Sequence, residues 1–64
     1  MEEPFSSREL SEALRAINSM LAKCQKALPK LREGSPQRTL LVRRVRAFEV
    51  AVALLERELA RQDP

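Results

Sequence analysis

The feature that most constrains the fold is a pair of apolar seams with the same spacing, one in each half of the chain. In each seam, apolar residues recur every four and three residues in turn, which is the spacing of side chains that face a packed neighbouring helix. The chain is therefore predicted to be all-α, with two amphipathic helices. The seams are Leu10, Leu14, Ile17, Leu21, Cys24 and Leu28, and Leu41, Val45, Phe48, Val52, Leu55 and Leu59.

Start and stop signals mark the ends of both helices. Ser6 followed by Glu9 has the spacing of a capping box at the start of the first helix. Pro29 lacks a backbone N–H and restricts the residue before it, so the first helix should end or kink just before it. Gly34 suits a left-handed terminating position, and Ser35-Pro36 suits an N-cap and first helical residue. The predicted elements are a first helix at about 7–28, a turn at 29–35 and a second helix at about 36–61.

The two seams match layer by layer if the chain folds back at Gly34. Residues whose numbers add up to 69 then lie level, and all six layers are apolar on both sides. A shift of one heptad would leave seam residues without apolar partners at both ends. Residues 1–64 are therefore expected to form one domain, an antiparallel two-helix hairpin.

The second helix carries more apolar surface than one neighbouring helix can cover. A second apolar stripe lies beside its seam, and the apolar arc reaches about 200°, against about 100° for an ordinary surface helix. A chain of 64 residues also buries too little surface to be very stable alone. We therefore expect association with a helical partner, most simply as a homodimeric four-helix bundle. The expected interface residues are Leu40, Arg44, Ala47, Val50, Ala51, Leu54 and Glu58.

Two charged residues in this stripe predict how two copies pair. Arg44 and Glu58 each lie seven residues from Ala51. In an antiparallel pairing of two second helices centred on Ala51, Arg44 of one copy comes level with Glu58 of the other, twice by symmetry. A parallel pairing would instead bring like charges together. Charges beside a seam select orientation and register more than they add stability, so the prediction is an antiparallel pair.

The middle of the chain is strongly basic. Residues 23–46 hold eight Lys and Arg side chains against Glu33 alone, whereas both ends of the chain are mildly acidic. Such a surface could bind nucleic-acid phosphates, be complementary to a partner's acidic ends, or only be solvated. A nucleic-acid-binding hairpin dimer is thus the alternative function, although no Tyr or Trp offers a base-stacking platform and Phe48 lies in the seam. The candidate phosphate-binding residues are Lys30, Arg32, Arg38, Arg43 and Arg46.

Few residues could support catalysis or bind a metal. The chain has no His, and its single cysteine, Cys24, falls on a seam, so a Cys–His nucleophile and an ordinary zinc site are excluded. Gly34 is the only glycine, so no phosphate-cradling glycine loop exists. With no long apolar run and no export signal, we expect a cytoplasmic location without a membrane span. The predicted function is a non-enzymatic protein-interaction module with no cofactor or small-molecule substrate.

One segment of the second helix resembles a known family. Residues 46–55, Arg-Ala-Phe-Glu-Val-Ala-Val-Ala-Leu-Leu, follow a Gly-containing turn, and Leu21-Ala22-Lys23-Cys24 precedes that turn. This arrangement is similar to the small helical-hairpin co-chaperones of type III secretion needle subunits, the YscE and PscE kind, over about forty residues. The resemblance implies a bacterial, chaperone-like adaptor that pairs with a larger helical-repeat protein.

Overall fold

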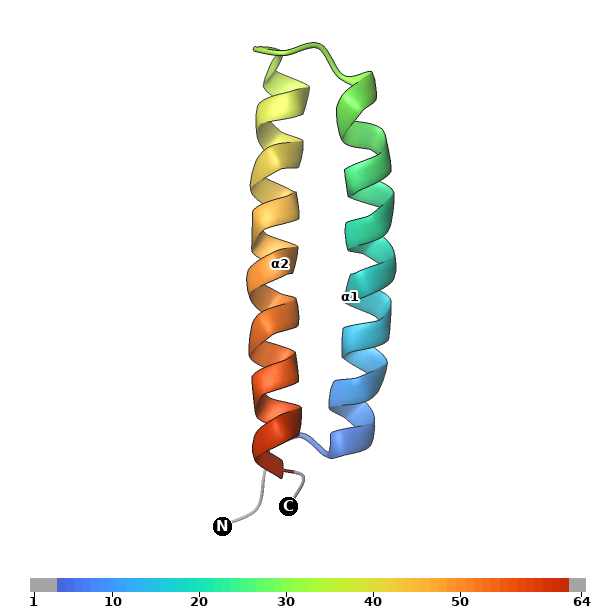
Figure 1. The fold of residues 1–64 in the computed structure, drawn as a ribbon, viewed down its shortest axis with the longest axis vertical. Helices are drawn as coiled ribbons and strands as arrows, with labels where there is room; N and C mark the ends of the chain where they lie inside the picture. The colour runs from blue at the N-terminus through green and yellow to red at the C-terminus, as the bar shows by residue number, and fades with distance from the viewer. Residues whose placement is uncertain (1–3, 63–64) are drawn as a thin grey trace.

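Two long helices packed against each other make up the fold (Figure 1). The structure, a computed structural model, describes residues 4–62. Helix α1 (Ser7–Ala27) leads into a short 3-10 turn, η1 (Leu28–Lys30), and helix α2 (Pro36–Gln62) returns antiparallel to it. No strand occurs within residues 4–62. The expected all-α helical hairpin is confirmed.

The start of α1 is fixed by the capping box that the sequence predicts. The backbone N–H of Glu9 donates to Ser6 Oγ at 3.1 Å, and the backbone N–H of Ser6 donates to Glu9 Oε1 at 3.0 Å. Two of the amide groups that a helix start leaves unpaired are therefore satisfied. The carboxylate of Glu9 also lies in the first turn, where the helix dipole favours negative charge.

The end of α1 is set by Pro29. Leu28 keeps helical backbone angles and its N–H still donates to the Cys24 carbonyl. Pro29 then stands at the start of η1, a position where a missing N–H costs little. Leu31 is extended and its N–H donates to the Leu28 carbonyl at 3.1 Å. The irregular turn thus begins as one tight 3-10 turn directly after the helix.

Gly34 and Ser35 start the second helix. Gly34 has a φ of +80°, the left-handed conformation that glycine adopts without strain. Ser35 Oγ accepts a hydrogen bond from the Arg38 backbone N–H at 3.2 Å, and the Ser35 carbonyl accepts from Thr39 N–H at 3.1 Å. Ser35 is therefore the N-cap of α2, and Pro36 is its first helical residue.

The core of the hairpin is the single layer between its helices. All twelve seam residues are half-buried or better, which agrees with the predicted seams. Among residues 4–62, only Leu10 is fully buried, with 5% of its surface exposed. The central layers, including Leu21 and Phe48, are only half-buried. Each seam is covered by the one helix that faces it, and no third element covers its flanks.

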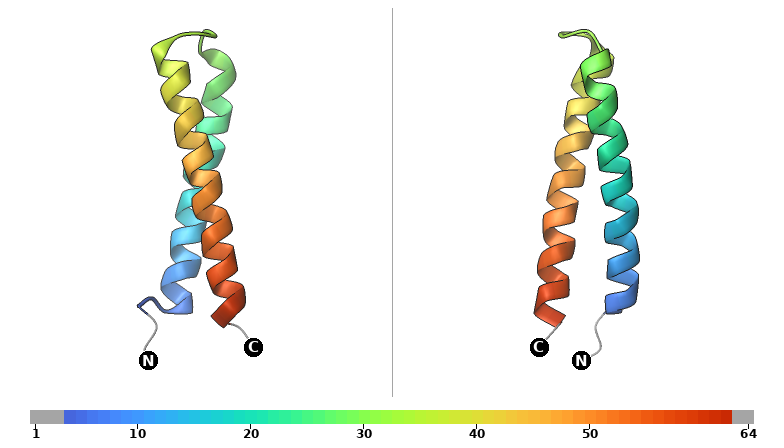
Figure 2. Two further views of the ribbon diagram at one scale, coloured as in Figure 1. Left: turned by 90° about the vertical axis from the view of Figure 1, so that its left-hand side faces the viewer. Right: turned by 45° about the vertical axis from the view of Figure 1, so that its right-hand side comes forward.

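The molecule is a slender rod rather than a compact domain. It measures 48 × 17 × 16 Å. Figure 2 shows that the two helices cross at a shallow angle and pack side by side. The accessible surface is 5402 Å², whereas a compact monomer of this mass would expose about 4,200 Å². A hairpin with no third layer therefore leaves apolar surface in water.

Candidate interaction surfaces

The hairpin has two broad faces. Each face consists of the residues that lie beside the seam on one side of α1 and on the matching side of α2. Met20 and Lys23 of α1 line one hollow together with Arg44 and Phe48 of α2. This contact places the Met20 side of α1 and the Arg44 side of α2 on the same broad face. Because successive residues of a helix are turned by about 100°, the other residues on the same flank of each helix can be assigned to this face. Those on the opposite flanks must share the other broad face.

The first of these faces is apolar along most of its length. Leu40 and Leu54 are 51% and 56% exposed, and Met20 is 44% exposed. Small residues separate them, so backbones of neighbouring helices could approach closely there. Val50, also part of the predicted interface, lies farther round, on the outer side of α2. We call this the apolar face, and it consists of Ala13, Ala16, Met20 and Ala27 from α1 and Leu40, Ala47, Ala51 and Leu54 from α2.

The opposite face is polar. Its flank on α1 carries hydroxyl and amide side chains, and its flank on α2 carries two carboxylates with one large apolar residue, Val42, which is 47% exposed. Such a mixture is ordinary for a solvated surface. We call it the polar face, and its residues are Ser11, Asn18 and Gln25 from α1 and Val42, Glu49 and Glu56 from α2.

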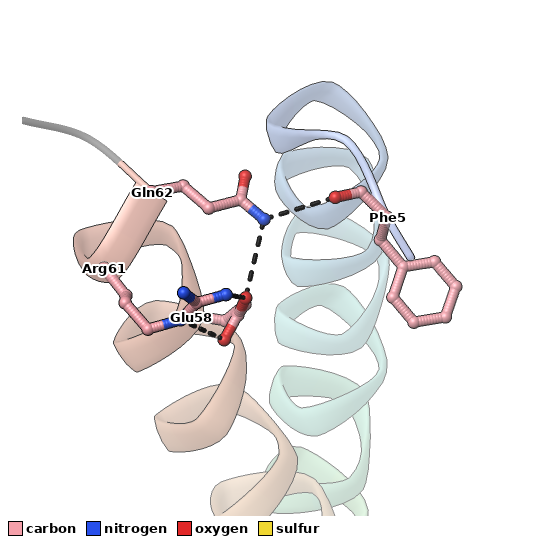
Figure 3. A network of polar contacts seen from close by, with 4 residues as sticks. All are labelled: Phe5, Glu58, Arg61 and Gln62. Carbon is pink, nitrogen blue, oxygen red and sulfur yellow. Dashed lines mark hydrogen bonds and ion pairs between the residues drawn. The ribbon is translucent and has the colours of Figure 1, made fainter. Parts of the chain in front are cut away.

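Two charged residues share the α2 flank of the apolar face, Arg44 between Leu40 and Ala47, and Glu58 beyond Leu54 at the open end. Arg44 is exposed beside the hollow that Met20 and Phe48 line. Glu58 is half-buried and accepts hydrogen bonds from the guanidinium of Arg61, one of them at 3.1 Å (Figure 3). The hydrogen bond from Arg61 holds the pKa of the Glu58 carboxyl below its ordinary value. Glu58 is therefore ionised at neutral pH, as an ion pair across an interface requires.

At the open end of the hairpin, one hydrogen bond joins the two termini of the helices. Gln62 Nε2 donates to the carbonyl oxygen of Phe5 at 3.2 Å and reaches Glu58 Oε1 at 3.5 Å (Figure 3). Phe5 itself lines a hollow with Leu10, Ala13 and Leu55, although 56% of its surface is exposed. The hydrogen bond from Gln62 thus connects α2 to the start of α1 at the open end, and two hydrogen bonds from Arg38 connect α2 to the end of α1 at the closed end.

At the closed end, Arg38 binds the end of the first helix. Its Nη1 donates to the carbonyl oxygens of Leu28 at 2.8 Å and Leu31 at 3.3 Å. Those carbonyls follow the last turn of α1, where a helix leaves acceptors unpaired. Sequence reasoning named Arg38 only as a candidate phosphate-binding residue and missed this role. The signal was present, since Arg38 lies three residues before Leu41 and thus continues the seam of α2.

The other candidate phosphate-binding residues are spread over the closed end. Arg43 lines a shallow hollow with Gly34 and Arg38, but Glu33 lines it too. Arg46 pairs with Glu49 at 3.7 Å. Lys30 and Arg32 are exposed around the turn. The structure therefore brings Arg38 and Arg43 to one hollow and leaves the other three apart from it, so phosphate binding stays a prediction.

Residues 4–62 contain no group of three His, Cys, Asp or Glu side chains that could hold a metal ion. Cys24 is a free, half-buried thiol beside Met20 and Phe48. Neither helix is apolar enough over a sufficient length to cross a membrane, judged on the same residues.

Comparison with known proteins adds no relative. No protein-family model, no curated protein and no solved structure matches the chain. The function must therefore be inferred from the two surfaces themselves.

Proposed function

We propose that the chain is a non-enzymatic protein-interaction module that self-associates through its apolar face. The observation that carries this proposal is the asymmetry between the two broad faces. Leu40, Leu54 and Met20 are about half exposed on one face, separated by alanines, whereas the other face is mostly polar. Contiguous exposed apolar surface of this kind marks an association site in soluble proteins.

The surface area of the hairpin supports the same proposal. An extended chain of 7.3 kDa exposes about 10,600 Å², so the hairpin, at 5402 Å², buries about half of that, against about 60% for a compact domain of this size. Chains this small generally need a disulfide, a metal or oligomerisation for stability. Cys24 has no second cysteine to bond with, and the chain has no His. Association with another chain is therefore the simplest way to bury the surface that the single hairpin leaves exposed.

The state of the carboxylates also supports a non-enzymatic role. General acids at neutral pH need a raised pKa, which burial usually provides. The pKa of Glu58 moves the other way, because Arg61 binds its charged form. Glu9, Glu12 and Glu56 lie exposed on helix surfaces.

Nucleic-acid binding by the basic closed end is the alternative, and it has less support. The guanidinium of Arg38 already donates to two backbone carbonyls, and Arg46 pairs with Glu49. Phe5, which is 56% exposed, lies beside Gln62 at the open end (Figure 3), whereas the basic residues surround the turn at the other end of the hairpin. Binding of this kind should fall steeply with salt, with a smaller slope after Arg43→Ala. Absence of RNA or DNA binding at low salt would rule it out.

The proposal is tested by sedimentation equilibrium on a matched pair of variants of α2. The parent chain should have twice its monomer mass at high micromolar concentration. Leu54→Gln places a polar group on the apolar face and should shift the chain to monomer, whereas Val42→Gln makes a similar change on the polar face and should leave the mass unaltered. Leu54 and Val42 are similarly exposed in the hairpin, so a general loss of stability would affect both. A parent that stays monomeric at every concentration contradicts the proposal.

A further inference from the structure

We infer that the partner is a second copy whose apolar face packs antiparallel against the first, so that the closed end of each hairpin lies beside the open end of the other. This inference rests on the proposed self-association and specifies its geometry. A two-fold axis perpendicular to the helices then passes beside Ala51 of α2. Because the hairpin is one packed unit, the same axis must pass beside the level position in α1, which is residue 18. One axis therefore fixes the pairing of α2 with its copy and of α1 with its copy, so the side chains of both helices must fit it.

The charge distribution favours this orientation. Residues 23–46 surround the closed end with a surplus of seven positive charges, whereas the described residues of the two segments that meet at the open end, 4–22 and 47–62, are close to neutral with a net charge of −1. An antiparallel pair places each basic end beside a nearly neutral end. A pair with both closed ends together would place the two basic regions side by side, where like charges repel.

Along α2, the antiparallel axis brings complementary side chains level. Ala51 meets Ala51 of the second copy, which permits close approach of the helices. One layer to either side, Leu54 of one copy comes level with Phe48 of the other, and Ala47 comes level with Leu55. A further layer out, Arg44 comes level with Glu58 of the second copy, and Glu58 is held in its charged form. No layer of this register places two like charges together.

Along α1, the same axis gives a second complementary set that the α2 pairing did not use. Residues whose numbers add up to 36 come level across the axis, so Met20 of one copy meets Ala16 of the other. Lys23 meets Ala13, and Glu9 meets Ala27, in the neighbouring layers. Each of these three layers places a long side chain against an alanine. The acidic start of α1 also lies beside the basic end of its counterpart.

The elongated shape of the hairpin leaves surface that a second copy can cover. Each chain exposes about 1,200 Å² more than a compact monomer of its mass. Obligate homodimer interfaces generally bury 2,000 Å² or more in total, so a second copy must cover about 1,000 Å² on each hairpin. The hollow beside Met20, Lys23, Arg44 and Phe48 would lie at this interface, with the half-exposed edge of Phe48 covered.

Disulfide trapping tests the geometry on the full chain. In a Cys24→Ala background, Ala51→Cys should crosslink to itself in a glutathione buffer at least tenfold faster than Ala53→Cys, an exposed position on the same helix away from the apolar face. A disulfide requires the two Cβ atoms to approach within about 4.5 Å, and a residue comes that close to its own copy only beside the axis. A chain carrying Ala16→Cys mixed with one carrying Met20→Cys should give the mixed disulfide in preference to either self-crosslink.

The two possible failures are distinguishable. If the Cys24→Ala parent sediments as a Leu54-dependent dimer but Ala51→Cys crosslinks no faster than Ala53→Cys, the antiparallel geometry is overturned and the proposed self-association stands. If the Cys24→Ala and Cys24-containing parents are both monomeric, self-association and its geometry fail together. Trapping at Ala51 without the Ala16–Met20 disulfide would also overturn the inference, since one axis must serve both helices.

Discussion

The apolar face and the polar face of the hairpin are built from the same two helices, yet they differ in kind. On the polar face, side chains such as Asn18 and Glu49 cover the flanks of the seam with groups that water solvates. On the apolar face, the corresponding flanks carry Met20, Leu54 and alanines. A helical hairpin buries only one layer, so its stability depends on what covers its flanks. This contrast is the basis for the proposal that a second hairpin covers the apolar face.

The largest effect should come from the seam residue that lies beneath the apolar face. Phe48 is half-buried between the helices and lines the hollow on the apolar face. If a second copy completes its burial, Phe48→Ala should cost about 3–5 kcal/mol in chemical denaturation. A loss below about 1 kcal/mol would mean that the ring lies outside the core, contrary to the seam register. Intermediate losses that do not change with protein concentration would mean that the apolar face stays open.

The closed end should come next, because Arg38 ties the two helices that form both faces. Arg38→Gln removes two hydrogen bonds from a charged donor to backbone carbonyls, and should destabilise the hairpin by about 1–2 kcal/mol. Arg43→Gln removes the same charge from the same hollow and is the matched control. Urea denaturation of both variants makes the comparison. Equal losses would show that only the charge at Arg38 matters.

The smallest effect should come from the charges that bound the apolar face. Arg44→Glu should raise the dimer dissociation constant by a few-fold to about 30-fold, since each exposed ion pair contributes at most about 1 kcal/mol and symmetry makes two. Adding Glu58→Arg should restore much of the affinity. The rescue is measured by sedimentation rather than by unfolding, because Glu58→Arg also removes the hydrogen bonds from Arg61.

Arg57→Glu is the control for this charge reversal. Arg57 is exposed on the outer side of α2, opposite the seam, so the same change there should leave the dissociation constant unaltered. If Arg44→Glu and Arg57→Glu behave alike, Arg44 lies outside the interface.

Much of the fold could be predicted from the sequence because the signals are local and periodic. The capping box at Ser6 and Glu9, the N-cap at Ser35 and the left-handed Gly34 depend only on neighbouring residues. The seam depends on a repeat that each helix shows by itself. That two matching seams face each other follows from their equal length, and the half-buried pattern agrees with it.

The polar ends of the seam could not be predicted in the same way. Arg38 and Gln62 both continue the apolar repeat of α2 with polar side chains, and each donates to a backbone carbonyl at an end of α1. An apolar repeat is recognised by its apolar residues, so the repeat in α2 was read as ending before Arg38 and Gln62. Which flanks share a broad face also required the structure, because a pattern on one helix does not say which side of its neighbour it meets.

The central claim, that the apolar face is covered and the polar face is not, is tested most directly by the methyl groups of two alanines. Ala47 lies on the apolar face and Ala53 on the other side of α2, and both are exposed in the single hairpin. With a soluble paramagnetic probe at concentrations where the chain associates, NMR relaxation of the Ala53 methyl should be enhanced several-fold more than that of Ala47. On dilution, the two enhancements should converge as dimers dissociate. Equal enhancement at all concentrations would contradict the account.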